Sequence, residues 1–423
     1  MLKPEVDSSD NMSYIKWYVI GGVFDALPST KLRQNGCLAP KIGSIMVDSE
    51  QAATQDTPQR QEPEINKFFR VAIKTRASDL HLKVGQPPKL RIQDELKNTT
   101  GEALSEQRLE QLTFEILTDE QKQIFLKQGT LDFSYGVTEE ERFRVNLFRQ
   151  RGLISLVARR VNNEIPTIEQ LHLPEALKKI ADGSQGLILV VGPTGSGKTT
   201  TAVSMIDYIN TTRSCHIVTI EDPIEYFIKD KKAIVSQREI SIDVPDYDQA
   251  LTYLMREDPD VVFIGELRDA GTVAAGMRAS ETGHLVFGTI HASSAAQTVQ
   301  RLIDLFPQVE RDLARQTLSL TLRAIVSQVL LPCVKKGTDR IPAVEILIVN
   351  PEARKLISEG RETEISNLIR GCAEEGMQTL ADSLVKLIMD GSVEPKEAYK
   401  HSPNPEELKM ALKGIRTEKG GIL

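Results

Sequence analysis

Residues 192–199 read Gly192-Pro193-Thr194-Gly195-Ser196-Gly197-Lys198-Thr199, and they match the phosphate-loop pattern G-x-x-x-x-G-K-[ST] at every constrained position. The apolar run 187–191 before the loop is typical of a buried parallel strand, and residues 200–209 after it are typical of a helix. Phosphate binding requires this order of strand, glycine-rich loop and helix. The stretch therefore predicts a nucleoside-triphosphate site on an α/β fold.

Each residue type in this loop has a physical role toward a phosphate. Glycines let backbone N–H groups curl around the anion, and the helix N-terminus adds partial positive charge. We expect Lys198 to reach the β- and γ-phosphates of ATP and the Thr199 hydroxyl to ligate Mg²⁺. The predicted nucleotide-binding set runs from Gly192 to Thr200.

Length, net charge, cysteine spacing and the lengths of apolar stretches indicate which broad class of protein the chain belongs to. The chain has 423 residues, enough for two or three domains, and a net charge of -7, which gives no indication of a nucleic-acid partner. The four cysteines form no C-x-x-C pair, so neither a disulfide framework nor a zinc site is expected. The apolar stretch 14–24 is shorter than the roughly 18 residues of a membrane span. These features predict a cytoplasmic protein.

Residues 1–174 divide into three segments of different composition and hydrophobic pattern. Residues 1–61 are polar and irregular, and we interpret them as a tail and linker, or as sequence upstream of a true start at Met12 or Met46. Residues 62–161 mix short strands with helices, including one expected over 105–128, and they predict a small α+β domain. Residues 162–174 contain two prolines and are expected to be a linker.

The remainder divides into three predicted segments. Residues 175–307 alternate apolar strands with helices, as expected of a mainly parallel, covered sheet that forms the ATPase core. Residues 308–400 are expected to be mainly amphipathic helix, with one helix over 313–331. Residues 401–423 are expected to be a flexible tail. The core strands are expected at 187–191, 216–220, 261–265 and 285–290.

One carboxylate ends an apolar strand in the core segment. The strand 260–266 finishes at Glu266, a position that lies beside the γ-phosphate in phosphate-loop enzymes. Glu266 is our candidate for polarising the attacking water, and the alternative is an ordinary glutamate at a strand end. Gly265 stands where many such enzymes have an aspartate, so contact with Mg²⁺ would pass through water or through Glu266 itself.

A second acidic group follows the strand at 216–220. Glu221, Asp222 and Glu225 concentrate three carboxylates within five residues, which is costly unless a cation or water is near. Glu221 is our candidate for orienting water and Glu225 for the metal side, together with Thr199 and Glu266. The alternative is a solvated turn at Asp222-Pro223.

Histidines and arginines complete the candidate catalytic set. His284 and His291 flank the strand 285–289, and either imidazole could sense the γ-phosphate, although a structural role is the alternative. Arg142 and Arg144 in the first domain are candidates for an arginine supplied to a neighbouring subunit. Further candidates, which could equally be surface ion pairs, are Arg238, Arg256 and Arg268.

Taken together, these runs resemble the secretion-superfamily hexameric ATPases, and most closely the PilT-type retraction ATPases of type IV pili. The resemblance covers residues 64 to 390 in the same order. Beside the phosphate loop, it rests on Ala77-Ser-Asp-Leu-His-Leu82, Arg142-Phe-Arg-Val-Asn146, Thr219-Ile-Glu-Asp-Pro-Ile-Glu225, Arg256-Glu-Asp-Pro-Asp260, Gly265-Glu-Leu-Arg-Asp269, Glu281-Thr-Gly-His-Leu-Val-Phe-Gly-Thr289 and Gly376-Met-Gln-Thr-Leu380. In that family, 219–225 resembles the aspartate box, 260–266 the Walker B strand and 284–291 the histidine box.

The resemblance implies a RecA-like P-loop NTPase core with a PAS-like α+β N-terminal domain and C-terminal helices. It implies a ring of six copies with ATP between one subunit's core and a neighbour's first domain, so that Arg142 and Arg144 face the neighbour's phosphates. ATP hydrolysis would drive a pilus platform protein at the inner face of the cytoplasmic membrane, with a sister pilus ATPase as a further partner.

Three functions stay open at this point. A retraction motor is favoured by the short N-terminal region, the absence of a tetracysteine insert and the motif at 376–380. An assembly or secretion motor of the same superfamily is the second. An accessory subunit that binds ATP and regulates a sister motor is the third, and the presence of Lys198 and Glu266 argues against it.

Overall fold

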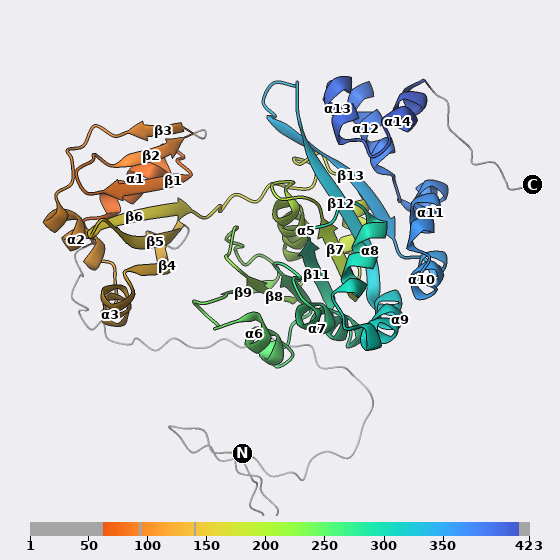
Figure 1. The fold of residues 1–423 in the computed structure, drawn as a ribbon, viewed down its shortest axis with the longest axis horizontal. Coiled ribbons are helices and arrows are strands. Elements are labelled where there is room, and N and C mark those ends of the chain that lie inside the picture. Colours follow the sequence, from red (N-terminus) through yellow and green to blue (C-terminus); the bar gives the residue numbers. More distant parts are fainter. Residues whose placement is uncertain (1–61, 93–94, 139–140, 414–423) are drawn as a thin grey trace, which may run out of the picture. The chain divides into compact units, whose positions relative to one another are not determined.

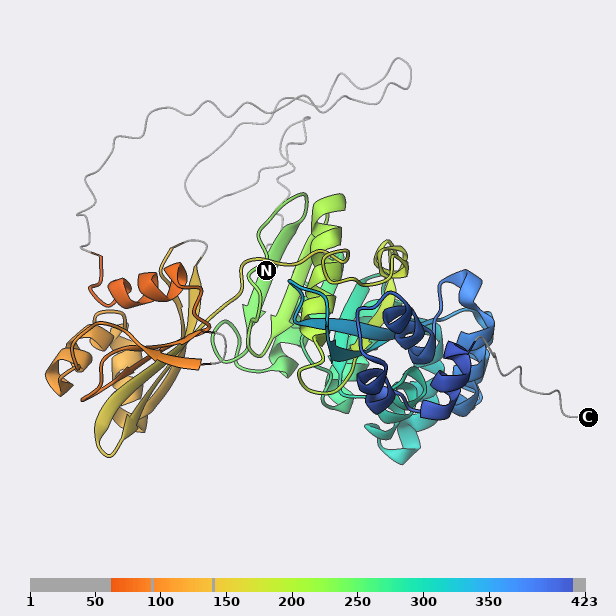
Figure 2. The same cartoon turned by 90° about the horizontal axis from the view of Figure 1, so that it is seen from above.

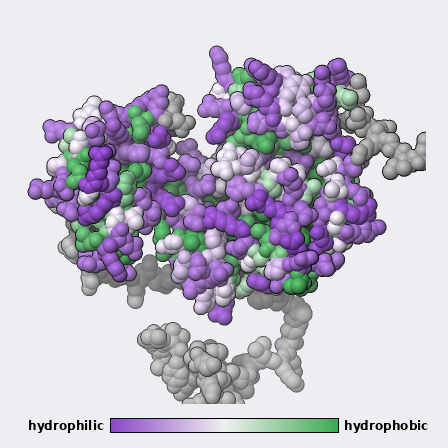
Figure 3. All heavy atoms as spheres, viewed as in Figure 1, coloured by the Kyte–Doolittle hydropathy of each residue, from purple (hydrophilic) through white to green (hydrophobic). Residues whose placement is uncertain are grey.

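A computed structural model describes residues 62–92, 95–138 and 141–413 of the chain (Figure 1). The predicted tail at 1–61 and the last ten residues of the predicted flexible tail lie outside these ranges. No helix in the described part of the chain is long and apolar enough to cross a membrane. The visible face in Figure 3 is mostly hydrophilic, with apolar side chains scattered over it.

The first part of the described chain is built on one antiparallel sheet. Its six strands lie in the order β3-β2-β1-β6-β5-β4. Buried Phe69, Phe125 and Phe143 belong to a core that packs its helices against this sheet. The elements are α1 (Asn66–Lys74), β1 (Asp79–Lys83), β2 (Lys89–Ile92), β3 (Glu95–Asn98), α2 (Glu106–Phe114), α3 (Asp119–Gln128), β4 (Thr130–Gly136), β5 (Arg142–Gln150) and β6 (Leu153–Arg160).

The single helix expected over 105–128 is two helices, α2 and α3. Thr118 adopts an extended backbone and caps α3, because its hydroxyl accepts from the N–H of Gln121 and the Gln121 side chain bonds back to the Thr118 N–H. This reciprocal cap starts a new helix inside a continuous helical pattern.

The second part is built on a seven-stranded sheet in the order β13-β12-β7-β11-β10-β8-β9. All neighbouring strands are parallel except β12 and β13. The elements are α4 (Ala176–Ala181), β7 (Gly186–Val191), α5 (Lys198–Thr212), β8 (His216–Glu221), β9 (Ile234–Glu239), α6 (Tyr247–Leu254), β10 (Val261–Ile264), α7 (Ala270–Glu281), β11 (Leu285–Ile290), α8 (Ala295–Asp304), α9 (Arg311–Thr321), β12 (Leu322–Pro332) and β13 (Arg340–Ile348).

Both faces of this sheet are buried, as the apolar strands predicted. Every residue of β7 is buried; Leu187, Leu189 and Val191 join one core cluster, while Ile188 and Val190 join another. Alternate side chains of a strand point to opposite faces, so the two clusters are the two sides of the sheet. The predicted strands in the core segment are all present.

The helix predicted over 313–331 is wrong beyond Thr321. The helix α9 ends there, and the chain continues as β12, which pairs with β7 on one side and β13 on the other. A strand buried on both faces reads as a continuous apolar run, and periodicity alone does not separate such a run from a buried helix. The segment 308–400 therefore contributes two strands to the core sheet and is not purely helical.

Short helices follow the sheet and lie beside β12 and β13 in Figures 1 and 2. Leu384 and Leu408 are fully buried in a small core with Leu331 and Ala343 of these strands. The helices are α10 (Pro351–Ser358), α11 (Ile365–Gly371), α12 (Leu380–Met389), α13 (Pro395–His401) and α14 (Pro405–Leu412). Helices α12, α13 and α14 are thus packed onto the edge of the core sheet, while the buried side chains of α10 and α11 join the larger core cluster that covers one face of the sheet.

Candidate active site

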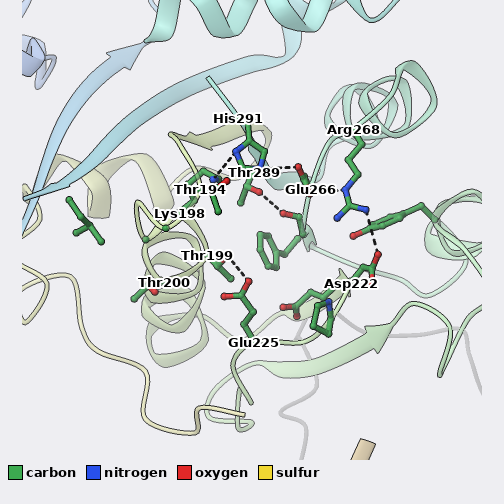
Figure 4. A pocket seen from close by; sticks show the side chains of 18 of the residues that line it. Thr194, Lys198, Thr199, Thr200, Asp222, Glu225, Glu266, Arg268, Thr289 and His291 are labelled. Carbon is green, nitrogen blue, oxygen red and sulfur yellow. Dashed lines mark hydrogen bonds and ion pairs between the residues drawn. The ribbon is translucent and has the colours of Figure 1, made fainter. Parts of the chain in front are cut away.

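The parallel strands gather the candidate residues at one edge of the core sheet. The phosphate loop follows β7, Glu221 ends β8, Glu266 follows β10 and His291 follows β11. Because parallel strands share one carboxyl edge, residues that follow them meet although they are far apart in sequence. Around this edge lies a cavity of about 470 Å³ (Figure 4). Its lining residues are Thr194, Gly195, Gly197, Lys198, Thr199, Thr200, Glu221, Asp222, Pro223, Glu225, Tyr247, Phe263, Gly265, Glu266, Arg268, Thr289, His291, Leu330 and Arg340.

The phosphate loop connects the buried strand β7 to the start of α5. Gly197 has φ +83° and precedes Lys198, the first residue of the helix. A Cβ on Gly197 would lie 2.9 Å from Nε2 of Gln328, so both the backbone angle and the space require glycine. Of the predicted nucleotide-binding set, Gly192, Pro193 and Ser196 belong to the loop without lining the cavity.

The Lys198 ammonium lies inside the loop. Its Nζ donates to the carbonyl oxygens of Gly192 at 3.0 Å and Pro193 at 3.1 Å, and it lies 3.5 Å from Nδ1 of His291. Partial burial lowers the pKa of Lys198, and the nearby carboxylates of Glu266 and Glu225 oppose that shift. A bound phosphate would act in the same direction as these carboxylates, because an anion favours the charged amine.

The first turn of α5 carries two hydroxyls toward β8. The Thr199 hydroxyl donates to Oε1 of Glu225 at 3.3 Å, and the Thr200 hydroxyl lies 2.9 Å from the Tyr226 hydroxyl. Burial raises the pKa of Glu225. The pair Thr199 and Glu225 offers hard oxygen ligands beside the phosphate loop, and oxygen ligands are those that Mg²⁺ prefers.

Glu266 is held by two cationic or titratable side chains. Its Oε2 accepts from Nε of Arg268 at 2.7 Å, and its Oε1 lies 3.3 Å from Nε2 of His291. Arg268 also lies 3.6 Å from Asp222. The imidazole of His291 therefore stands between Lys198 and Glu266, and a proton on Nε2 satisfies both contacts (Figure 4).

Glu221 is the most deeply buried carboxylate of the group. Its side chain accepts from the Thr219 hydroxyl at 2.6 Å and from Nε2 of Gln237 at 3.1 Å. Burial raises its pKa to about 7, although these two hydrogen bonds act in the opposite direction. A carboxylate with this pKa can exchange a proton near neutral pH, as a general base does.

Replacing Glu221 by Gln is expected to change the pH dependence of stability. A carboxylate whose pKa is about 7 folded and 4.5 unfolded makes the free energy of unfolding fall as pH rises between these values. The wild type should lose on the order of 3 kcal/mol more than Glu221→Gln across this window, because the amide does not titrate while the other carboxylates are common to both proteins. Urea denaturation at pH 5 and pH 8, without nucleotide, measures both. A stability difference between the two proteins that stays constant would contradict the raised pKa.

The structure does not place His284 at this cavity of its own chain, so its predicted catalytic role gains no support from the cavity. His284 precedes β11 and lies at the amino end of the strand, where its Nδ1 lies 2.9 Å from the carbonyl oxygen of Ala279 and 3.1 Å from the Thr282 hydroxyl. His291 follows the same strand and lines the cavity. Both histidines flank the same strand in the sequence. The direction of that strand in the sheet decides which of them lies at the cavity.

Arg142 and Arg144 lie on β5 of the N-terminal sheet and do not line the cavity of their own chain. Arg238 bonds to Glu257, and Arg256 stacks over the Tyr253 ring at 5.4 Å. Arg268 is therefore the arginine that the structure brings to Glu266. A role for Arg142 and Arg144 requires a second copy of the chain.

Sequence reasoning missed Gln328, which contacts the phosphate loop from β12. This side chain is buried; its Nε2 donates to the Ser196 carbonyl at 2.6 Å and its Oε1 accepts from the Thr201 hydroxyl at 2.8 Å. The cavity also includes Leu330 from the same strand. A helix was expected over this segment, so nothing in the sequence directed these residues to the loop.

Comparison with known proteins assigns the family. A family model described as "Type II/IV secretion system protein" matches residues 54–400. The chain belongs to this family. It is 39% identical over 343 residues to the type IV pilus retraction ATPase PilT of Pseudomonas aeruginosa, which covers 81% of this chain and 99% of that protein. It is 35% identical over 350 residues to the type IV pilus ATPase PilU of the same organism, covering 83% and 91%.

A solved structure agrees with this family assignment. The crystal structure of the pilus retraction motor PilT with bound ADP is 42% identical and has a TM-score of 0.75, covering 82% of this chain and 98% of that one. The predicted fold class, a RecA-like core with C-terminal helices, is confirmed by this likeness and by the seven-stranded sheet. This member of the family is a phosphate-loop ATPase.

Proposed function

We propose that this ATPase is the motor that retracts type IV pili, working as a ring of six copies. The observation that carries the proposal is the match to a retraction ATPase along 99% of that protein's length. The phosphate loop of this chain also has the required residue at every constrained position. The 42% identity to a solved retraction motor supports the same function.

In the proposed cycle, ATP binds with its phosphates against the loop. Backbone N–H groups of residues 194–199 and the Lys198 ammonium bind the phosphate oxygens, and Glu266 orients the attacking water toward the γ-phosphorus. Arg268 and His291 position Glu266, because they bond to its two oxygens. Glu221, whose pKa is about 7, helps to orient the same water. Arg142 and Arg144 of a neighbouring copy stabilise the charge that develops on the transferred phosphoryl group.

The residues present fit a Mg²⁺ ion that arrives with the nucleotide. In the described ranges, no three His, Cys, Asp or Glu side chains are placed to hold a metal ion by themselves. Mg²⁺ in nucleotide sites needs only one or two protein ligands, because water and the phosphates supply the rest. Thr199, Glu225 and Glu266 are the candidates for these ligands, and the ion would neutralise charge on the phosphates.

The proposed setting is the inner face of the cytoplasmic membrane. There the ring would act on a platform protein of the pilus machine, and a sister ATPase could share the work, as the likeness to PilU suggests. The segments predicted for the chain remain our proposal for its domain boundaries, with two changes. The strands of 322–348 belong to the core sheet. The predicted flexible tail at 401–423 includes the helix α14, whose Leu408 is fully buried, so residues 405–412 belong to the C-terminal helices.

The test combines enzymology with a deletion strain. ATP turnover per subunit should rise with protein concentration as six-membered rings form, measured with light scattering on the same samples. Deletion of the gene should leave cells that extend pili without retracting them. Loss of all pili would indicate an assembly motor instead. Rings that bind ATP without turnover would indicate an accessory subunit.

A further inference from the structure

Gln328 is the one buried side chain that joins the phosphate loop to the neighbouring strand β12 by hydrogen bonds at both ends of its amide, within the described residues. Its residue is 2% exposed. The donor end bonds to a carbonyl of the loop, Ser196, and the acceptor end bonds to Thr201 on the first turn of α5. The amide therefore spans the loop and the helix that the loop precedes.

A phosphate loop works only if its peptide planes have one orientation. The N–H groups must point at the anion, so the carbonyl oxygens must point away from it and find partners elsewhere. The Ser196 carbonyl finds its partner in Gln328, at 2.6 Å. A buried carbonyl without a partner is unfavourable, so loss of this bond would favour other orientations of the peptide between Ser196 and Gly197.

Tight packing supports the same role. The Ser196 hydroxyl is buried and has no hydrogen-bond partner, so the carbonyl bond is what anchors this residue to the sheet. Gly197 follows with a positive φ of +83°, and Nε2 of Gln328 occupies the space that a Cβ there would need. The side chain of Gln328 thus packs directly against the loop at Gly197.

We infer that Gln328 is a positioning residue of the nucleotide site: it holds the phosphate loop in the conformation that binds phosphate. Its side chain does not line the cavity, and it acts through Ser196 and Thr201. The inference rests on the proposed function only in taking the cavity as the site where ATP binds and is hydrolysed. Gln328 also makes β12, and through it β13, part of the nucleotide site.

The test measures ADP affinity of the full chain with Gln328→Leu, which removes both hydrogen bonds and puts an apolar side chain of similar size in place of the amide. The dissociation constant for ADP should rise roughly tenfold or more, since one such bond corresponds to about that factor. The KM for ATP should rise with it, while kcat changes less, because a distorted loop weakens binding of substrate and product alike.

Gln378→Leu is the matched control. Gln378 is a second buried glutamine, whose Nε2 donates to the Val344 carbonyl at 2.9 Å and whose Oε1 accepts from Lys386, and it does not line the nucleotide cavity. Both variants should lower the melting temperature similarly, and only Gln328→Leu should weaken ADP binding. Thr201→Val, which removes one of the two bonds, should give an intermediate dissociation constant.

The outcomes separate this inference from the proposed motor. A folded Gln328→Leu protein that binds ADP within twofold of the wild type would overturn the inference. So would equal weakening in the Gln378 control, which would indicate general destabilisation. ADP binding requires neither hydrolysis nor retraction, so a wild type that binds ADP without turnover would refute the motor and leave the Gln328 comparison intact.

Discussion

Replacing Lys198 by Ala is expected to weaken ADP and ATP binding at least about 100-fold. Lys198 is the lysine of the phosphate loop, and its Nζ lies between the loop carbonyls and His291, where phosphate oxygens would bind. The ammonium is partly buried, so its attraction to an anion is screened less than at the surface. Without it, backbone N–H groups alone would face the phosphate charge. Titration calorimetry or a fluorescent ADP analogue measures the loss.

A surface lysine gives the control for this prediction. Lys179 on α4 is exposed and does not line the cavity, so Lys179→Ala should bind ADP like the wild type. Lys198→Ala protein should still form rings, because the residue lies within the site of its own chain. Retained ADP affinity in Lys198→Ala would mean that the phosphates bind elsewhere.

The same variant tests the proposed arginine contact across subunits. Lys198→Ala and Arg144→Ala subunits should each be inactive in pure rings, but mixed rings should recover part of the turnover. At some interfaces an intact phosphate loop would then face an intact Arg144. No recovery at any mixing ratio would count against a contribution from the neighbouring copy.

Replacing Glu266 by Gln is expected to slow ATP turnover by roughly 10² to 10³-fold while ATP still binds. The amide has the same shape, and its oxygen can still accept from Arg268. It carries no negative charge, however, so it orients and polarises the attacking water poorly. The dissociation constant for ATP should therefore stay within about threefold of the wild-type value, while kcat falls.

Glu362→Gln is a suitable control for this substitution. Glu362, like Glu266, is bonded to an arginine, Arg315; it is buried and does not line the cavity. Its variant should hydrolyse ATP at the wild-type rate if the protein folds. Near-normal turnover in Glu266→Gln would remove Glu266 from the water-orienting role, and Glu221 would become the stronger candidate.

Much of the site was predictable from sequence, because its chemistry is local. The phosphate loop needs eight consecutive residues of restricted type between a buried strand and a helix, and chance seldom supplies all three together. Glu221 and Glu266 were predicted because each ends an apolar run. Parallel strands bring their carboxyl ends together, so placing these residues on strands was enough to predict that they meet.

Sequence alone could not assign the residues whose positions depend on the direction of a strand and on which strands pair with it. His284 and His291 flank one strand equally in sequence, and the parallel pairing of β11 with β7 decides that His291 reaches the loop. Gln328 belongs to an apolar run whose periodicity fits a buried helix as well as a strand. Only its pairing with β7 places it under Ser196. Sequence determined the phosphate chemistry, because that chemistry depends on adjacent residues; tertiary structure decided which distant side chains support it, because strand order and direction are set by packing of the whole sheet.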